Sequence, residues 1–282
     1  MAVLWQTHRR GVTYEVRGAG SSVRLYTNGI FHSQWNSRHV LTGALWDLLT
    51  LPGFLLSTSH PLRVLVLGVG GGAVIRQQLA LLNIEEIVGV ELDDVHLQIA
   101  RRWFGLSKFG NVSLRCADVR DWLEQYNGAG FDIVIDDLFG HAGAETERSV
   151  AIDRYWSGQL ASVLSPEAVL ITNTVSLGEQ QAIKNVLKPV IDGADASTGN
   201  SKPRPRITAG YSLRHPLYDN QIMVLHRAVQ TPVTRQWRKH WIEQIDTQIT
   251  DATCVSLAKT HLQRASRWYS SWCPAGRGGA GL

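Results

Sequence analysis

One stretch of this chain constrains its fold more than any other, because it joins a buried strand, a glycine turn and a helix. Residues 64–67 form an unbroken apolar run, which is typical of a parallel strand covered on both faces. Glycines follow at positions 68, 70, 71 and 72, and without a Cβ they let the backbone bend tightly and approach a ligand. From Ala73 the apolar residues recur at helical spacing. The stretch predicts a nucleotide-like ligand at the start of the helix, where backbone amides lack helical partners. A turn that only packs a helix against a strand is the alternative.

Strands and helices alternate after this turn. Four more strands are predicted, each followed by a helical pattern, at residues 86–91, 111–116, 131–137 and 168–174. Five such units imply an α/β fold with a parallel sheet and helices on both faces. Residues 207–213 and 221–227 are expected to add a closing pair of strands.

The flanking segments suggest four parts. We predict an N-terminal β unit and helix at 1–56, a Rossmann-like domain at 57–229, a helical extension at 230–273 and a disordered tail at 274–282. In the first part, alternating segments with turns at Gly18 and Asn28-Gly29 precede a helix from Ser37 to Leu51. In the third, apolar positions at helical spacing continue to Tyr269.

Composition excludes several classes of protein. The 282 residues are 44% hydrophobic and 18% charged, as in an ordinary globular protein, and no apolar run is long enough to span a membrane. The first residues lack the pattern of a signal peptide, and three scattered cysteines do not make a disulfide framework or a zinc site. We therefore expect a cytoplasmic protein without a membrane partner. The net charge of +4 is too small to indicate nucleic-acid binding by itself.

Acidic residues end the three strands that follow the glycine turn. Glu91 ends the second strand, Asp118 follows the third, and Asp137 ends the fourth. Ligands of such sheets bind at the carboxyl ends of the parallel strands, so these acids are candidate ligand contacts. The alternative for Asp118 in particular is a structural role as a helix N-cap. Asp136, on the opposite side of its strand, is expected to be structural.

A glycine turn with a downstream acid also occurs in hydride-transfer dehydrogenases. Here the turn is Gly-x-Gly-Gly-Gly, and Ala73 takes the last position of the fingerprint, which its looser form allows. The turn alone therefore does not distinguish a dehydrogenase from another protein that binds a nucleotide-like ligand.

Several motifs together resemble one family. They are Thr27-Asn28-Gly29-Ile30-Phe31, Arg38-His39, Gly68-Val69-Gly70-Gly71-Gly72, Val90-Glu91-Leu92-Asp93, Ala117-Asp118, Phe131 to Asp137, and Leu164-Ser165-Pro166-Glu167-Ala168. From about Gly11 to Arg227 the chain resembles the spermidine synthases and their relatives on the class I methyltransferase fold.

The resemblance implies which residues form the ligand site and what each of them contacts. Gly68, Gly70 and Gly71 would face the sulfonium end of an S-adenosylmethionine-type donor. Glu91 would hold the ribose and Asp118 the adenine amine. Asp137 falls where the family has the acid beside the transferred group, and it would act as a general base or orient the acceptor.

The departures from the family fall on the acceptor side. A second acid expected three residues after Asp137 is replaced by Gly140, followed by His141. A glutamine of the N-terminal strand is replaced by His32, and the acid after His39 by Val40. A diamine is a dication that needs carboxylates in place of its water, so these losses argue against putrescine.

Three histidines are therefore candidates for the acceptor side: His32, His39 and His141. The alternatives are a packed helix residue for His39 and a solvated loop residue for His141. Their spacing is no metal-ligand motif, so we expect no metal.

We expect a transferase that moves the methyl group of S-adenosylmethionine to a small-molecule acceptor. The alternatives are an aminopropyltransferase that uses decarboxylated S-adenosylmethionine with a polyamine, and a nucleoside-binding protein without activity. We do not expect a nucleic-acid partner, because the basic segments lie beside acids and the motif of nucleic-acid amine methyltransferases is missing. The tail tryptophans would serve as core or as the contact of a homodimer.

Overall fold

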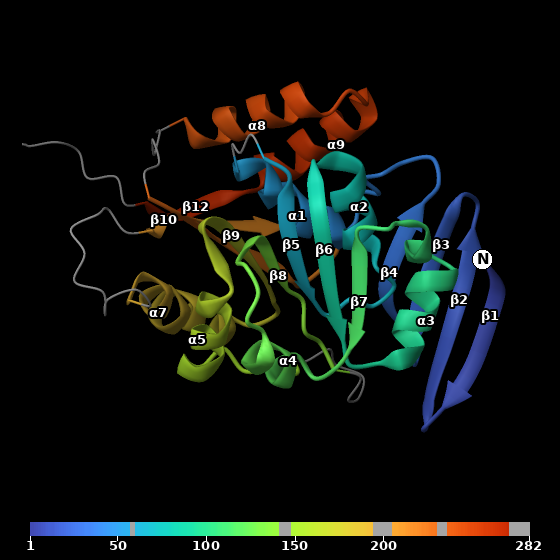
Figure 1. The fold of residues 1–282 in the computed structure, drawn as a ribbon. Coiled ribbons are helices and arrows are strands. Elements are labelled where there is room, and N and C mark those ends of the chain that lie inside the picture. Colours follow the sequence, from blue (N-terminus) through green and yellow to red (C-terminus); the bar gives the residue numbers. More distant parts are fainter. Residues whose placement is uncertain (57–59, 141–147, 194–204, 230–235, 271–282) are drawn as a thin grey trace, which may run out of the picture.

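The computed structural model describes residues 1–56, 60–140, 148–193, 205–229 and 236–270. These residues form two sheets, with helices on both faces of the larger one (Figure 1). His141 and the tail at 274–282 lie outside the described residues. The predictions made for them therefore stay predictions, as does the division of the chain into four parts.

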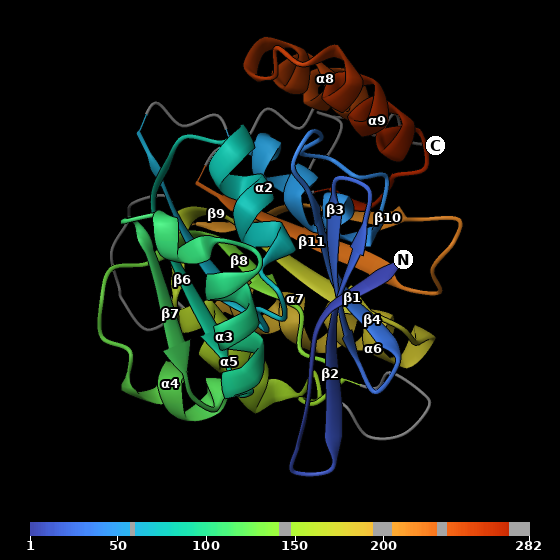
Figure 2. The same ribbon diagram turned by 90° about the vertical axis from the view of Figure 1, so that its right-hand side faces the viewer.

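The N-terminal sheet is an antiparallel meander of four strands in the order β1-β2-β3-β4. Their bounds are β1 Ala2–Arg9, β2 Val12–Ala19, β3 Ser22–Thr27 and β4 Ile30–Asn36. Asn28 and Gly29 have positive φ, 50° and 80°, which both residue types tolerate in a tight hairpin turn. The predicted β unit is thus present; it lies to one side of the larger sheet in Figure 1 and in front of it in Figure 2.

The larger sheet has the strand order β12-β10-β11-β9-β8-β5-β6-β7. Its parallel strands are β5 Leu62–Leu67, β6 Ile84–Glu91, β7 Val112–Cys116, β8 Phe131–Asp136 and β9 Leu164–Thr174. The closing strands, β10 Arg206–Arg214 and β11 Gln221–Ala228, pair antiparallel with each other, and β11 pairs antiparallel with β9. The predicted α/β fold with its five parallel strands is confirmed.

Two hydrophobic cores lie on opposite faces of this sheet, because successive side chains of a strand point to opposite faces. Val66 and Ile135 belong to the core beneath α2 Ala73–Leu81 and α3 Asp94–Arg102. Leu65 and Val134 belong to the core on the opposite face, beneath a second group of helices. These are α4 Val119–Gln125, α5 Arg154–Ser162, α6 Leu177–Ala182, the π-helical turn η3 Ile183–Leu187 and α7 Lys188–Gly193 (Figures 1 and 2).

The helix predicted from Ser37 to Leu51 is much shorter in the structure. It is α1 Leu45–Thr50, which is followed by the 3₁₀ turn η1 Leu51–Leu55. A second 3₁₀ turn, η2 Leu106–Lys108, follows α3. The Asp47 side chain accepts hydrogen bonds from the amides of Thr42 and Gly43, at 3.1 and 2.7 Å. These contacts, with a φ of 70° at Gly43, fold the preceding segment back and prevent an earlier helix start. The prediction of a helix carrying His39 is therefore wrong.

The C-terminal extension contains two helices and a strand. The helices are α8 Trp237–Gln248 and α9 Ala252–Gln263, and the strand is β12 Ser266–Ser270, which pairs with β10. The prediction that the second helix reaches Tyr269 is wrong, because Trp268 and Tyr269 have a sheet edge to pair with, which favours aromatic residues in a strand. The predicted apolar face of the first helix is confirmed: Trp241 and Ile245 are fully buried. Among the described residues, no helix has the length and apolar character needed to cross a membrane.

Candidate active site

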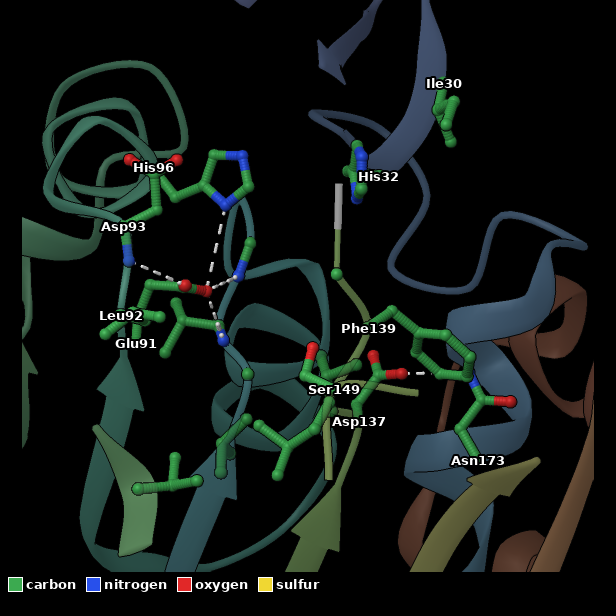
Figure 3. A pocket seen from close by; sticks show the side chains of 18 of the residues that line it. Ile30, His32, Glu91, Leu92, Asp93, His96, Asp137, Phe139, Ser149 and Asn173 are labelled. Carbon is green, nitrogen blue, oxygen red and sulfur yellow. Dashed lines mark hydrogen bonds and ion pairs between the residues drawn. The ribbon is translucent and has the colours of Figure 1, made fainter. Parts of the chain in front are cut away.

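A cavity of about 560 Å³ opens at the carboxyl ends of β5, β6 and β8 and extends to the N-terminal sheet. Figure 3 shows Glu91 and His96 on one side of it, Asp137 and Asn173 on the other, and His32 above them. The topology brings these groups together, since parallel strands end at the same edge of a sheet. The predicted acids at positions 91, 118 and 137 all line this cavity.

The glycine turn has two kinds of glycine. Gly68 has a φ of +88°, and an added Cβ would collide with the Asp137 carbonyl, so only glycine lets β5 and β8 approach so closely here. Gly68 and Gly70 line the cavity, whereas Gly71 does not. A Cβ at Gly71 would lie 2.6 Å from Phe104 and 2.8 Å from Ser33, so this glycine serves helix packing. The packing of Gly71 weighs against the expectation that it faces the donor, which stays a prediction.

Two backbone amides of the glycine turn are not free, because they donate hydrogen bonds to the Glu91 carboxylate. Its Oε2 accepts from the amides of Val69 and Gly70, at 3.0 and 2.9 Å, and its Oε1 from that of Asp93, at 3.0 Å. Burial opposes the charge, but His96 and these amides outweigh it, so the pKa of Glu91 lies below its usual value. Oε1 accepts from the Asp93 amide, and an oxygen of a carboxylate can accept a second hydrogen bond, which leaves a position for a ligand hydroxyl.

Side chains of the N-terminal sheet make hydrogen bonds to this side of the cavity. The Tyr14 hydroxyl donates to Asp93 Oδ2 at 2.6 Å, and Thr27 Oγ1 is 2.9 Å from His96 Nε2. His96 Nδ1 in turn lies 3.8 Å from Glu91 Oε2. The orientation of Glu91 therefore depends on contacts from β2 and β3 as well as on the glycine turn.

Asp118 has the structural role that was considered for it, and its position leaves the ligand role open as a prediction. It lines the cavity, and it is also the N-cap of α4, accepting a hydrogen bond from the Arg120 amide at 2.9 Å. The Arg120 guanidinium, 2.9 Å from Asp118 Oδ2, holds the pKa of this carboxyl below its usual range. A ligand amine would share this acid with Arg120.

Asp137 is held by a chain of two asparagines. Asn173 Nδ2 donates to Asp137 Oδ1 at 2.8 Å, and Asn220 Nδ2 donates to Asn173 Oδ1 at 3.0 Å. Burial raises the pKa of Asp137 to about 6, while the Asn173 amide and the charge of Arg148 act in the opposite direction. The side chain is thus oriented and still ionised at neutral pH, as a general base requires.

The neighbouring Asp136 is structural, as expected. Its carboxylate is fully buried and lies 2.8 Å from Nη2 of Arg148, which is 3% exposed. Trp156 Nε1 donates to the same carboxylate at 3.2 Å. Asp136 does not line the cavity and both of its partners hold it in the interior, so its charge serves the fold.

The cavity wall beyond Asp137 is apolar. We use the term acceptor wall for Phe31, Leu45, Trp46 and Tyr218, all of which line the cavity. The rings of Phe31 and Trp46 meet edge to face with centroids 4.9 Å apart, and Tyr218 bonds to the Leu45 backbone. Tyr218 is two positions from Asn220, which connects the acceptor wall to the asparagines that hold Asp137.

The three candidate histidines are not brought together in the described residues. His32 lines the cavity from β4, with its ring 5.6 Å from that of His96. His39 is exposed in a bend after β4 and does not line the cavity, so its predicted acceptor role is not supported. In the described ranges, no group of three or more His, Cys, Asp or Glu side chains could hold a metal ion.

Sequence reasoning missed several residues that line the cavity: Tyr14, His96, Ser149, Asn173, Tyr218 and Asn220. Asn173 could have been found, because it lies near the carboxyl end of β9, where the strand-end rule applies. Tyr218 and Asn220 lie in the loop between β10 and β11, where no local pattern marks them.

The residues present fit a nucleoside donor. The volume is in the range of small-molecule sites, and Gly70 leaves open backbone, since the nearest atom to an added Cβ is 3.5 Å away. Acids at successive strand ends offer acceptors for hydroxyl and amine groups. The fold and this site together define a class I methyltransferase-like α/β transferase.

The chain belongs to the family of the spermine/spermidine synthase domain, whose model matches residues 47–192. Among curated relatives, it is 30% identical over 147 residues to polyamine aminopropyltransferase 2 of Caldanaerobacter subterraneus, covering 50% of this chain and 46% of that protein. It is 29% identical over 153 residues to the human eEF1A lysine and N-terminal methyltransferase, covering 51% of this chain and 22% of that protein. The matched segments thus span less than half of these relatives.

Solved structures agree in fold. A probable spermidine synthase from Corynebacterium glutamicum superposes with a TM-score of 0.60 at 14% identity, covering 86% of this chain and 87% of that one. Human methyltransferase-like protein 13 gives a TM-score of 0.50 at 19% identity, covering 82% and 93%. At these identities the likeness concerns the fold alone.

Proposed function

We propose that this transferase binds S-adenosylmethionine and transfers its methyl group to a small acceptor beside Asp137. The observation that carries this proposal is the acceptor side of the cavity, where Asp137 is oriented by Asn173 and position 140 has no carboxylate. The similarity to a methyltransferase over half of this chain supports it.

The chain's own residues would position the two substrates. Glu91 and Asp118 would hold the nucleoside, and Asp137 would orient the acceptor and take its proton. The donor supplies an electrophilic methyl carbon: the acceptor's nucleophilic atom bonds to it as the carbon–sulfur bond breaks, and the electron pair stays on sulfur. The proton lost by the acceptor goes to the Asp137 carboxylate, so charge and atoms balance.

The second candidate is an aminopropyltransferase that uses decarboxylated S-adenosylmethionine and a polyamine. The family match and the similarity to a polyamine aminopropyltransferase favour it about as strongly as the first. The feature that weighs against it is Gly140, where an acid would favour a diamine. A nucleoside-binding protein without activity is the third candidate, and the ordered environment of Asp137 weighs against it.

Calorimetry with the two donors separates these candidates. Tighter binding of S-adenosylmethionine than of its decarboxylated form supports methyl transfer. A preference for the decarboxylated donor together with turnover of putrescine would contradict it. If neither nucleoside binds, the assignment of the donor site is itself wrong.

A matched pair of variants then separates binding from chemistry. Glu91→Ala removes the carboxylate that the turn amides of Val69 and Gly70 contact, and donor binding should be lost. Asp137→Asn keeps the size of the side chain but removes its charge. It should leave donor binding intact and reduce turnover by a factor of about 10²–10⁴, the usual contribution of a general base.

A further inference from the structure

The acceptor end of the cavity is the part between Asp137 and the acceptor wall. The charges there suit an acceptor that carries a single positive charge. Asp137 offers one carboxylate, and its Oδ1 already accepts from Asn173, which leaves Oδ2 for the amine of an acceptor. Asp136 is fully buried against Arg148. Asp47 lies beside the acceptor wall but is also fully buried, with its oxygens bonded to Thr42, Gly43 and Gln77.

The acceptor wall would disfavour a second ammonium group. The Phe31 ring is stacked with Tyr26 at a centroid distance of 5.2 Å, and the Arg24 guanidinium lies 5.5 Å from the same ring. The attraction that an aromatic face has for a cation is therefore already used by Arg24. The charge of Arg24 also reaches Tyr218: burial raises the pKa of this tyrosine, Arg24 opposes the rise, and the buried Asp47 adds to it.

We propose that the acceptor is a monoamine whose amino group docks on Asp137 Oδ2 and whose apolar body lies against the acceptor wall. The inference rests on the proposed function, and it names the class of substrate. A linear diamine that lies along this wall would place its second ammonium near Phe31 and Trp46, on the side of Arg24, where the wall itself offers no carboxylate. Burying an unpaired ammonium is costly.

The test compares two amines that differ only in this second charge. Butylamine and putrescine have the same four-carbon chain, and phenethylamine adds an aromatic body. Each is titrated by calorimetry into the full chain saturated with S-adenosylmethionine. We expect butylamine and phenethylamine to bind at least tenfold more tightly than putrescine. Putrescine binding as tightly as butylamine, or more tightly, would overturn the proposal.

A substitution at Gly140 adds the second carboxylate that a diamine needs for its second ammonium group. Gly140 lines the cavity and its φ is not in the left-handed region. Of the atoms in the described ranges, an added Cβ would meet only Ser149 Oγ, at 3.3 Å. Gly140→Asp should therefore fold and improve putrescine binding at least tenfold, with little gain for butylamine. Gly140→Asn, of the same size but uncharged, is the control and should leave the preference unchanged.

The outcomes separate this inference from the function on which it rests. If the chain does not bind S-adenosylmethionine, the proposed function fails before any amine is added. If the donor binds but all three amines bind more weakly than a neutral alcohol of the same length, the acceptor is no amine and the inference alone fails. If Gly140→Asn improves putrescine binding as much as Gly140→Asp, charge does not set the preference, which also contradicts it.

Discussion

Asn173 Nδ2 donates a hydrogen bond to Asp137 Oδ1 at 2.8 Å, so the acid at the end of β8 is oriented by a residue of β9. This bond stabilises the carboxylate and opposes the effect of burial, which raises the pKa of Asp137 to about 6. Because the base acts in its deprotonated form, turnover should decrease as pH falls through about 6.

Asn173→Leu should move this decrease to higher pH. Losing one hydrogen bond to a charged group costs roughly 1.5–3 kcal/mol, so turnover at pH 6 should fall about tenfold or more. The pH profile of turnover at saturating donor measures this. Asn220→Ala, one step further from the acid, should have a smaller effect. A uniform loss of rate at every pH would mean that Asn173 only supports the fold.

The buried pair of Asp136 and Arg148 should be important for stability. Arg148→Met leaves Asp136 charged and fully buried without its partner, which typically costs about 3–5 kcal/mol. Urea unfolding measures the loss. Replacing both residues, Asp136→Asn with Arg148→Met, should recover part of it. The exposed pair of Lys259 and Asp246 is the control, and Lys259→Met should change stability little.

Gly68→Ala should damage both the fold and the site. The positive φ and the collision of the new Cβ with the Asp137 carbonyl both oppose the change, and we expect a loss of at least about 2 kcal/mol. Gly158→Ala, at an exposed position of α5 with no atom within 4 Å of the new Cβ, should instead stabilise by up to about 1 kcal/mol. Thermal unfolding compares the two variants. Equal stabilities would show that the turn can relax.

The C-terminal extension should influence the acceptor end of the cavity. His261 Nε2 of α9 lies 3.3 Å from Asp47 Oδ2, and Asp47 follows Trp46 of the acceptor wall. His261→Leu removes one partner from a buried carboxylate and should cost about 1–3 kcal/mol. It should weaken acceptor binding and leave donor binding unchanged, as measured by calorimetry. Thr260→Ala, exposed on the same helix, should alter neither affinity.

The parts of the site that lie at strand ends could be predicted, because each depends on a short stretch of chain. The apolar run before Gly68 predicts β5, and the position of Glu91 at the end of the next strand follows from the same local pattern. The helix predicted from Ser37 was wrong because Asp47 binds backbone amides that precede α1. Such contacts between a side chain and the backbone compete with helix formation, and periodicity does not show them.

By itself, the sequence determined the parallel strands, the glycine turn and the strand ends that carry the candidate acids, because the position and the end of each strand follow from local periodicity. Only the tertiary structure decided how Asp137 is held, since Asn173 and Asn220 lie 36 and 83 positions further along the chain. It also decided that Gly71 packs closely against Phe104. These roles depend on contacts between distant side chains, which no local pattern records.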